Sequence, residues 1–349
     1  MPTLPLSILD LAPIGSGSTA TEALRNALDL ARLADRLGYT RLWYAEHHNM
    51  PGVASSAPEI LIGAAARETT RLRVGSGGVM LPNHPPLKVV EWFRTLEALY
   101  PGRIDLGIGR APGTDGLTAL ALRRSREALT SDDFTAHLAE LLAFANGDFP
   151  DDHPFRQIRA TPIDVPLPPL WLLGSSDYSA QVAGMLGVGF AFARHINPDG
   201  AEEAIGRYRE EFSPSETLAG PRVILATSVI CADTDAEADR LATSADLSFL
   251  RLRSGRPGLL PSPEEAQAYP YTSVERAQVG ASRARHLIGT PVTIRPRLQE
   301  IIARVGADEV MITSSIHAHT ARLRSFTLLA EAFGLVPQPT PVPAEIARA

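Results

Sequence analysis

The chain has only one cysteine, Cys231, and lacks the sequence features of a secreted or membrane-spanning protein. A single thiol cannot form a disulfide within the chain, which is typical of a reducing compartment. No apolar run reaches the roughly 18 residues that a membrane span requires. No positively charged segment precedes an apolar one at the start, so no signal peptide is expected. These absences predict a cytoplasmic location.

Lysine is nearly absent too: Lys88 is the only one among 33 basic residues. The net charge is −6, with acidic and basic residues mixed, so no basic stripe indicates nucleic acid or an anionic membrane as a partner. The chain has neither a Gly-x-Ser-x-Gly elbow nor a Walker-type phosphate loop, which argues against nucleophilic hydrolysis. Cys231 lies in an apolar strand-like run, where a thiol is normally inert.

Short apolar runs alternate with helical patterns along the chain, and this alternation predicts the fold. Strands are predicted at residues 4–9, 41–45, 72–81, 103–108, 170–173, 190–193, 223–230 and 309–314. Helices are predicted at residues 19–38, 58–67, 88–99, 132–145, 178–186, 198–212, from 235 onward, and at 295–305 and 318–333. Eight such α/β units with buried, parallel-type strands favour a single (β/α)8 TIM barrel over residues 1–349. An open doubly wound sheet is the alternative.

The alternation is interrupted after the fourth and the seventh predicted strands, at about residues 111–158 and 251–281. Both interruptions fall at the carboxyl-terminal face of a barrel, where active sites are built. We therefore interpret them as insertions that cover a ligand. The tail, residues 336–349, is rich in proline and alanine and is expected to be loose.

Glu46-His47-His48 ends the second predicted strand, at that same face. Histidine exchanges protons near neutral pH, and a carboxylate beside it can orient it. Because side chains alternate along a strand, we expect His47 to point into the barrel mouth, Glu46 to brace the barrel and His48 to point away. The alternation also argues against one metal ion held by His47 and His48, and no metal site is predicted. A purely structural histidine pair is the alternative.

Three glycines interrupt the third predicted strand, in Val74-Gly75-Ser76-Gly77-Gly78. Glycine weakens a strand unless something must approach its backbone closely. A flat aromatic cofactor at the barrel mouth would supply that reason. A β-bulge or a tight corner is the alternative.

Two segments suit a phosphate group. Arg110 follows the fourth predicted strand and offers a fork of donors, although the glycines before it do not complete a dinucleotide motif. Residues 174–179, Gly-Ser-Ser-Asp-Tyr-Ser, open the helix after the fifth strand, where free amides and the helix dipole favour an anion. An ion pair at the rim and an ordinary helix cap are the alternatives. Three further histidines lie at or beyond strand ends and could line a pocket: His195, His317 and His319.

In this order, the motifs resemble the luciferase-like monooxygenase family from about residue 4 to residue 333. The matching segments are residues 46–48, 74–82, 102–103, 107–110 and 172–176. The resemblance implies an enzyme that uses reduced FMN, supplied by a separate flavin reductase, to oxygenate an organic substrate through a flavin peroxide. It identifies His47 as the catalytic histidine. The residues it places at the cofactor are Gly77, Gly78, Arg110, Ser175, Ser176, Tyr178 and Ser179.

The resemblance also implies a cis peptide bond between Gly77 and Gly78, and a homodimer formed through the helices at residues 57–66 and 88–99. It is incomplete at the end of the eighth strand, where luciferase has an acidic residue and this chain reads Thr-Ser-Ser-Ile-His at 313–317. The insertion after the seventh strand also differs, so light emission and an aldehyde substrate are not expected. An F420-dependent dehydrogenase on the same barrel and a flavin-binding protein without turnover are the alternatives.

Overall fold

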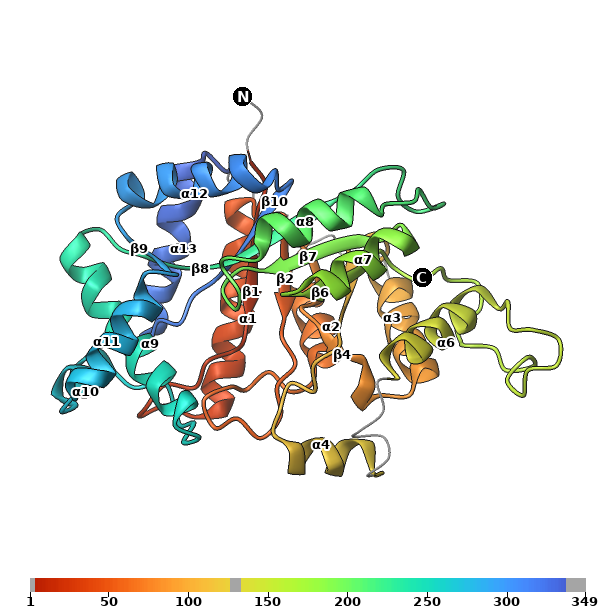
Figure 1. Cartoon of the computed structure of the whole chain (residues 1–349), viewed down its shortest axis with the longest axis horizontal. Coiled ribbons are helices and arrows are strands. Elements are labelled where there is room, and N and C mark those ends of the chain that lie inside the picture. Colours follow the sequence, from red (N-terminus) through yellow and green to blue (C-terminus); the bar gives the residue numbers. More distant parts are fainter. Residues whose placement is uncertain (1–3, 126–132, 337–349) are drawn as a thin grey trace, which may run out of the picture.

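The computed structural model describes residues 4–125 and 133–336. In this part of the chain eight parallel strands close into a barrel with helices around it (Figure 1), as the sequence predicts. The barrel strands are β1 (Leu6–Asp10), β2 (Arg41–Tyr44), β3 (Arg73–Ser76), β5 (Ile104–Gly109), β6 (Leu170–Gly174), β7 (Gly189–Ala193), β8 (Val223–Cys231) and β10 (Glu309–Thr313). The barrel closes because β10 pairs with both β1 and β8: Val310 lies opposite Leu6 and opposite Leu225.

Helices follow the strands and cover the outside of the barrel. Within the described ranges they are α1 (Ala20–Leu37), α2 (Pro58–Glu68), α3 (Pro86–Leu99), α4 (Gly116–Arg123), α6 (Phe134–Asn146), α7 (Asp177–Leu186), α8 (Ala201–Glu210), α9 (Asp235–Arg253), α10 (Pro263–Ala268), α11 (Ser273–Arg283), α12 (Pro291–Val305) and α13 (His319–Phe333). α1 begins at a capping box of Thr19 with Glu22 and ends at Gly38, whose φ of 87° is left-handed. No helix among the described residues is both long and apolar enough to cross a membrane.

The structure corrects the prediction at the third strand and in both insertions. The single strand predicted at 72–81 is two strands, β3 and β4 (Val79–Met80), followed by the short 3-10 helix η1 (Leu81–Asn83). The Gly77–Gly78 bond between β3 and β4 is cis, as the resemblance implies. The first insertion contains the unpredicted helix α4. The second contains α10 and α11, and the strand β9 (Leu287–Gly289) that pairs with β8 follows it. The predicted helix start at residue 132 and the tail from residue 337 lie outside the described residues.

The inside of the barrel is arranged in layers along its axis. At the amino-terminal end, Arg41 pairs with Asp105 (Nη1–Oδ2, 2.8 Å) and with Glu309 (Nε–Oε1, 2.7 Å). Above this ionic layer, the rings of Trp43 and Trp171 meet edge to face with centroids 5.7 Å apart. These rings belong to an apolar layer that fills the barrel. The barrel is therefore not a pore, and this layer closes the bottom of its carboxyl-terminal mouth.

Candidate active site

A cavity of about 280 Å³, the mouth cavity, lies at the carboxyl-terminal end of the barrel above this apolar layer. Its lining includes Leu9, Trp43 and Met311, which come from three different strands of that layer. Seven of the eight residues that the sequence places at the site also line it: His47, Gly77, Gly78, Arg110, Ser175, Ser176 and Ser179. Tyr178 is not in the lining. Its ring packs against Arg110, whose Cζ lies 4.4 Å from the ring centroid.

His47 reaches the mouth cavity from the loop after β2. Its Nδ1–H donates to the carbonyl oxygen of Gly113 at 3.2 Å, and a carbonyl only accepts, so Nε2 of the neutral ring carries the lone pair. Gly113 has a φ of +65°, and a Cβ on it would lie 2.7 Å from the carbonyl oxygen of Glu46, so the turn that supplies this acceptor requires glycine. Burial lowers the pKa of His47 more than Gly113 and Glu46 raise it. His47 is therefore neutral at pH 7, with Nε2 able to accept a proton.

His195, which follows β7, is a second histidine in the wall of the mouth cavity. Its Nδ1–H donates to the carbonyl oxygen of Ala226 at 3.2 Å, so its neutral ring has the same tautomer as His47. Burial lowers the pKa of His195, and His286 and His47 lower it further. The sequence placed this residue at a strand end but did not assign it to the site. Its position after a barrel strand was the available signal.

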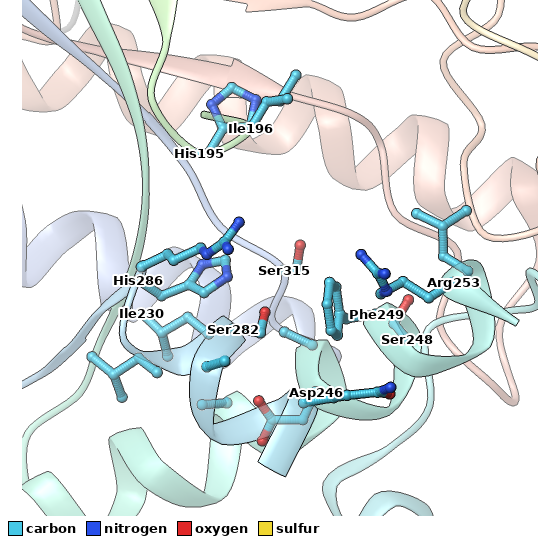
Figure 2. Close-up of a pocket in the computed structure, with 17 residues that line it drawn as sticks. His195, Ile196, Ile230, Asp246, Ser248, Phe249, Arg253, Ser282, His286 and Ser315 are labelled. Atoms are coloured by element: carbon cyan, nitrogen blue, oxygen red, sulfur yellow. The ribbon is translucent and has the colours of Figure 1, made fainter. Parts of the chain in front are cut away.

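A larger cavity of about 560 Å³, the side cavity, shares His195 and Ile196 with the mouth cavity. It lies between β8, α9 and α11, in the region where the sequence predicted an insertion over a ligand (Figure 2). The structure has a cavity in this region, and its occupation by a ligand stays a prediction. The sequence prediction did not include the helix α11, which forms one wall.

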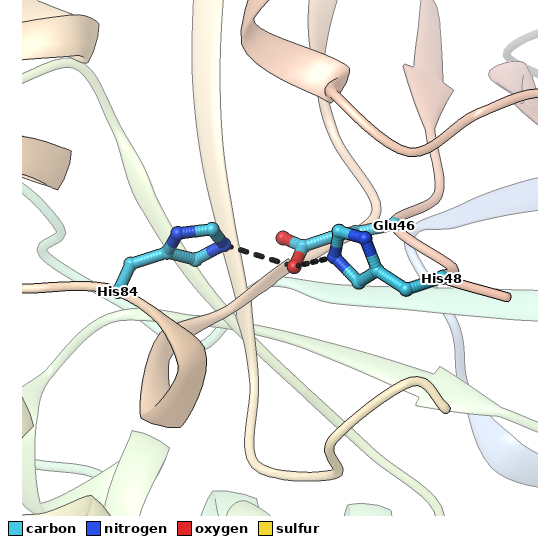
Figure 3. A group of neighbouring side chains, drawn as sticks. All are labelled: Glu46, His48 and His84. Atoms are coloured by element: carbon cyan, nitrogen blue, oxygen red, sulfur yellow. Dashed lines mark hydrogen bonds and ion pairs between the residues drawn. The ribbon is translucent and has the colours of Figure 1, made fainter. Parts of the chain in front are cut away.

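Glu46 precedes His47 in the chain and is buried, but it does not line the mouth cavity. It lies between His48 and His84 (Figure 3). Its Oε1 accepts hydrogen bonds from Nε2–H of His48 and of His84, both at 2.9 Å, and its Oε2 accepts the backbone N–H of Met80 at 2.9 Å. Burial raises the pKa of Glu46, but these hydrogen bonds outweigh it and the pKa lies below its ordinary value. The carboxylate thus ties the end of β2 to β4, which agrees with the bracing position predicted for it.

Glu46, His48 and His84 also bring three atoms of metal-ligand type within 4.8 Å of one another. Both imidazoles point Nε2–H at the same carboxylate oxygen, so the three side chains form a closed hydrogen-bond network. The sequence considered only His47 with His48 as a metal pair and missed His84. The signal was topological: Glu46 and His84 follow neighbouring strands, whose carboxyl ends meet at one edge.

Gly77 and Gly78 leave bare backbone at the mouth cavity, and the structure gives a further reason for glycine at both positions. A Cβ on Gly77 would lie 2.6 Å from Cδ1 of Leu9, and a Cβ on Gly78 would lie 2.8 Å from the carbonyl oxygen of Gly107. Packing against the Gly107 backbone therefore requires glycine at 78 independently of any ligand, whereas a side chain at 77 would need Leu9 to move. The prediction had attributed them to a cofactor or to a bulge.

The amino-terminal turn of α7 faces the mouth cavity with Ser175, Ser176 and Ser179. Ser176 is the N-cap residue, yet its side chain makes no capping hydrogen bond, in contrast to an ordinary capped helix. Nδ2 of Asn197 donates to the carbonyl oxygen of Ser175 at 2.9 Å and holds the turn in place. Backbone amides, serine hydroxyls and the guanidinium of Arg110 at the rim together form a donor set suited to a phosphate.

Proteins similar to this chain share its architecture over nearly its whole length. A family model described as luciferase-like monooxygenase matches residues 4–309. A luciferase-like monooxygenase of Escherichia coli (strain K12) is 46% identical over 326 residues, which are 93% of this chain and 96% of that protein. N-acetyl-S-alkylcysteine monooxygenase of Bacillus subtilis (strain 168) is 36% identical over 328 residues, 94% of this chain and 97% of that protein. The crystal structure of apo-MsnO8 matches with a TM-score of 0.88 and 42% identity, covering 96% of this chain and all 100% of that one. This chain therefore belongs to the luciferase-like monooxygenase family and is an enzyme of the oxidoreductase class.

Proposed function

We propose that the chain is a monooxygenase that uses reduced FMN to oxygenate a small organic substrate. The observation that carries the proposal is the composition of the mouth cavity. Its rim offers phosphate-binding donors at Arg110, Ser175 and Ser176, its floor is apolar, and the neutral His47 lines the same space. A flavin mononucleotide has the matching parts, a phosphate and a largely apolar ring system.

Bound FMN would supply the activation of oxygen, and the residues of this chain would bind it, orient it and exclude water. Arg110, Ser175 and Ser176 would hold the phosphate, with Ser179 in the same turn and Tyr178 supporting the guanidinium. The apolar layer beneath the cavity would keep water from the reacting atoms.

The bare backbone at Gly77 and Gly78 would admit the ring of the flavin closely. His47 is the residue that would move a proton, because Nε2 of its neutral ring has a lone pair and lines the cavity wall. Among residues 4–125 and 133–336, no protein group forms a hydrogen bond with that Nε2 atom. It is therefore available to a ligand.

The relatives favour oxygen chemistry over the F420-dependent dehydrogenase alternative. The Bacillus subtilis protein named N-acetyl-S-alkylcysteine monooxygenase aligns with 94% of this chain. Oxygenation is therefore the activity named for a protein that is similar to this chain over nearly its whole length.

The test mixes the purified protein anaerobically with reduced FMN or with reduced F420, then adds oxygenated buffer and records absorbance and oxygen uptake. The proposal expects that reduced FMN binds and that the protein changes its reaction with oxygen. Binding of F420 alone would favour the dehydrogenase. Binding of FMN with an unchanged reaction toward oxygen would indicate a flavin-binding protein without turnover.

We further propose a single barrel domain, located in the cytoplasm, that receives reduced FMN from a separate flavin reductase and assembles as a homodimer. The dimer would form through α2 and α3, where Ile60 and Leu99 are 69% and 65% exposed although other apolar side chains of these helices, such as Leu61 and Phe93, are buried. Light scattering at micromolar concentration should return twice the chain mass. Ile60→Glu together with Leu99→Glu should return the monomer mass, and a monomer mass for the parent protein would contradict the proposal.

A further inference from the structure

The side cavity has the size of a substrate pocket and adjoins the proposed cofactor site. Its volume of about 560 Å³ lies within the range of roughly 300–1,000 Å³ typical of small-molecule sites. His195 and Ile196 line both cavities, so a molecule in the side cavity would lie beside whatever fills the mouth. Figure 2 shows these two residues on one side of the cavity and Asp246 on the opposite side.

The charge in the side cavity is positive. Arg253 and Arg285 both line it, and within the described part of the chain neither has a carboxylate at ion-pair distance. The one acidic lining residue, Asp246, is buried and already paired with Arg283 (Oδ2–Nε, 2.8 Å). The lining histidine His286 adds no charge at neutral pH, because its pKa is lowered by burial and then by surrounding arginines.

The rest of the wall has an apolar part beside the polar side chains of Ser248, Gln278, Ser282 and Ser315. Ile230 and Ile288 come from the paired strands β8 and β9, and Phe249 comes from α9. Cζ of Arg253 lies 5.8 Å from the ring centroid of Phe249, so the cation and the apolar surface are neighbours. Figure 2 shows Phe249 and Arg253 together on one flank of the cavity. A ligand that fits this arrangement has an apolar body and an anionic end.

We propose that the side cavity is the substrate chamber of the enzyme and that it selects an organic anion, such as a carboxylate with an apolar tail. Arg285 binds the anionic group together with Arg253, and the apolar tail packs against Phe249 and the β8–β9 wall. The bound molecule thereby extends toward His195 and the mouth cavity. This assignment rests on the proposed function, because a substrate must reach the site where the flavin binds.

The test measures binding by calorimetry without flavin, with octanoate as the anionic probe and octanamide as its uncharged counterpart. Octanoate should bind at least about tenfold more tightly, since a charged hydrogen bond is lost in the amide. Arg285→Gln should remove most of that preference, and Arg253→Gln should reduce it. Arg276→Gln is the matched control, because Arg276 is an exposed arginine on α11, the helix that precedes Arg285, and does not line the cavity.

A second variant tests the location. Ala245→Phe fills the side cavity from α9 and should abolish octanoate binding while FMN affinity, measured separately, stays as in the parent protein. Equal binding of octanoate and octanamide, an unchanged preference in Arg285→Gln, or full octanoate binding in Ala245→Phe would each overturn the inference. Octanoate selectivity that depends on Arg285 in a protein without FMN binding would refute the proposed function alone and would support the anion site.

Discussion

The interior of the barrel at its amino-terminal end is filled by charges that bond one another, whereas the mouth cavity at the carboxyl-terminal end is lined by two neutral histidines. At the first end, Arg41 lies between Asp105 and Glu309, and Ser7 donates to Glu309. At the second end, Nδ1 of His47 and of His195 is bonded to a backbone carbonyl, and Nε2 of each bonds no group within residues 4–125 and 133–336. Charges that bond one another suit an end that stabilises the barrel. Ring nitrogens that can still form a hydrogen bond suit an end that binds a ligand.

The two ends also differ in how their residues depend on each other. The charges at the amino-terminal end bond one another, so removing Arg41 leaves the buried Glu309 without an ion-pair partner and takes one of two arginines from Asp105, which keeps Arg73. The residues around the mouth cavity come from separate strands and are each held by their own second contact, as His47 is held by Gly113. We therefore expect substitutions at the first end to reduce stability and substitutions at the second to reduce activity.

The largest effect is expected at His47. His47→Ala should bind FMN normally but oxygenate substrate about 10²–10⁴-fold more slowly, because a group that moves the proton is lost. The measurement is product formed per oxygen consumed, once a substrate is identified. His48→Ala is the control, since His48 bonds Glu46 and does not line the mouth cavity. Normal product formation in His47→Ala would make His47 structural and would remove the contrast between the two ends.

The next effect is on stability and belongs to the opposite end. Arg41→Met should lower the free energy of unfolding by about 3–5 kcal/mol, because Asp105 and Glu309 stay buried without their shared partner. Urea denaturation measures it. The control, Arg207→Met, removes an exposed pair with Glu211 (3.4 Å) and should cost less than about 1 kcal/mol. A stable Arg41→Met that binds FMN more weakly would reverse the assignment of roles to the two ends.

A smaller effect is expected at the rim of the mouth cavity. Arg110→Ala should weaken FMN binding by roughly 1.5–3 kcal/mol and leave riboflavin binding nearly unchanged, because only FMN carries the phosphate. Fluorescence titration of both flavins measures the difference. An equal loss for the two would place the phosphate elsewhere.

The site at the barrel mouth could largely be predicted from the sequence because strand order determines it. Once the strands are parallel and alternate with helices, the residues after each strand meet at one face. His47, Arg110 and the serines of α7 are all of this kind, and they line one cavity. Tyr178 belongs to the same segment, but the helical turn directs its ring behind Arg110, a detail that depends on side-chain packing.

The side cavity could not be predicted in the same way because helices form much of it. Proline and glycine in the second insertion hide the helical periodicity, although Thr272 with Glu275 forms a capping box that marks the start of α11. The closing of α11 onto α9 depends on Arg283, which bonds Asp246 and Asp239 from far along the chain. The need for glycine at 78 likewise comes from a contact between strands.

The smallest expected effect is a change in how stability depends on pH, and it tests whether His195 is neutral in the folded protein. Its pKa is lowered by burial and by His286 and His47, so below the ordinary pKa of histidine the unfolded chain binds a proton that the folded chain does not. Stability is therefore fully present above that pH and decreases as the pH falls through it.

His195→Gln keeps a donor for the Ala226 carbonyl but cannot titrate. Thermal unfolding between pH 7.5 and 5.5 should show a steeper loss of melting temperature in the parent than in this variant. His137→Gln is the control, because His137 lies on α6 and lines neither cavity. Parallel curves for the parent and His195→Gln would mean that His195 is protonated equally in the folded and the unfolded chain. The wall of the mouth cavity would then contain a charged histidine below the ordinary pKa of that residue.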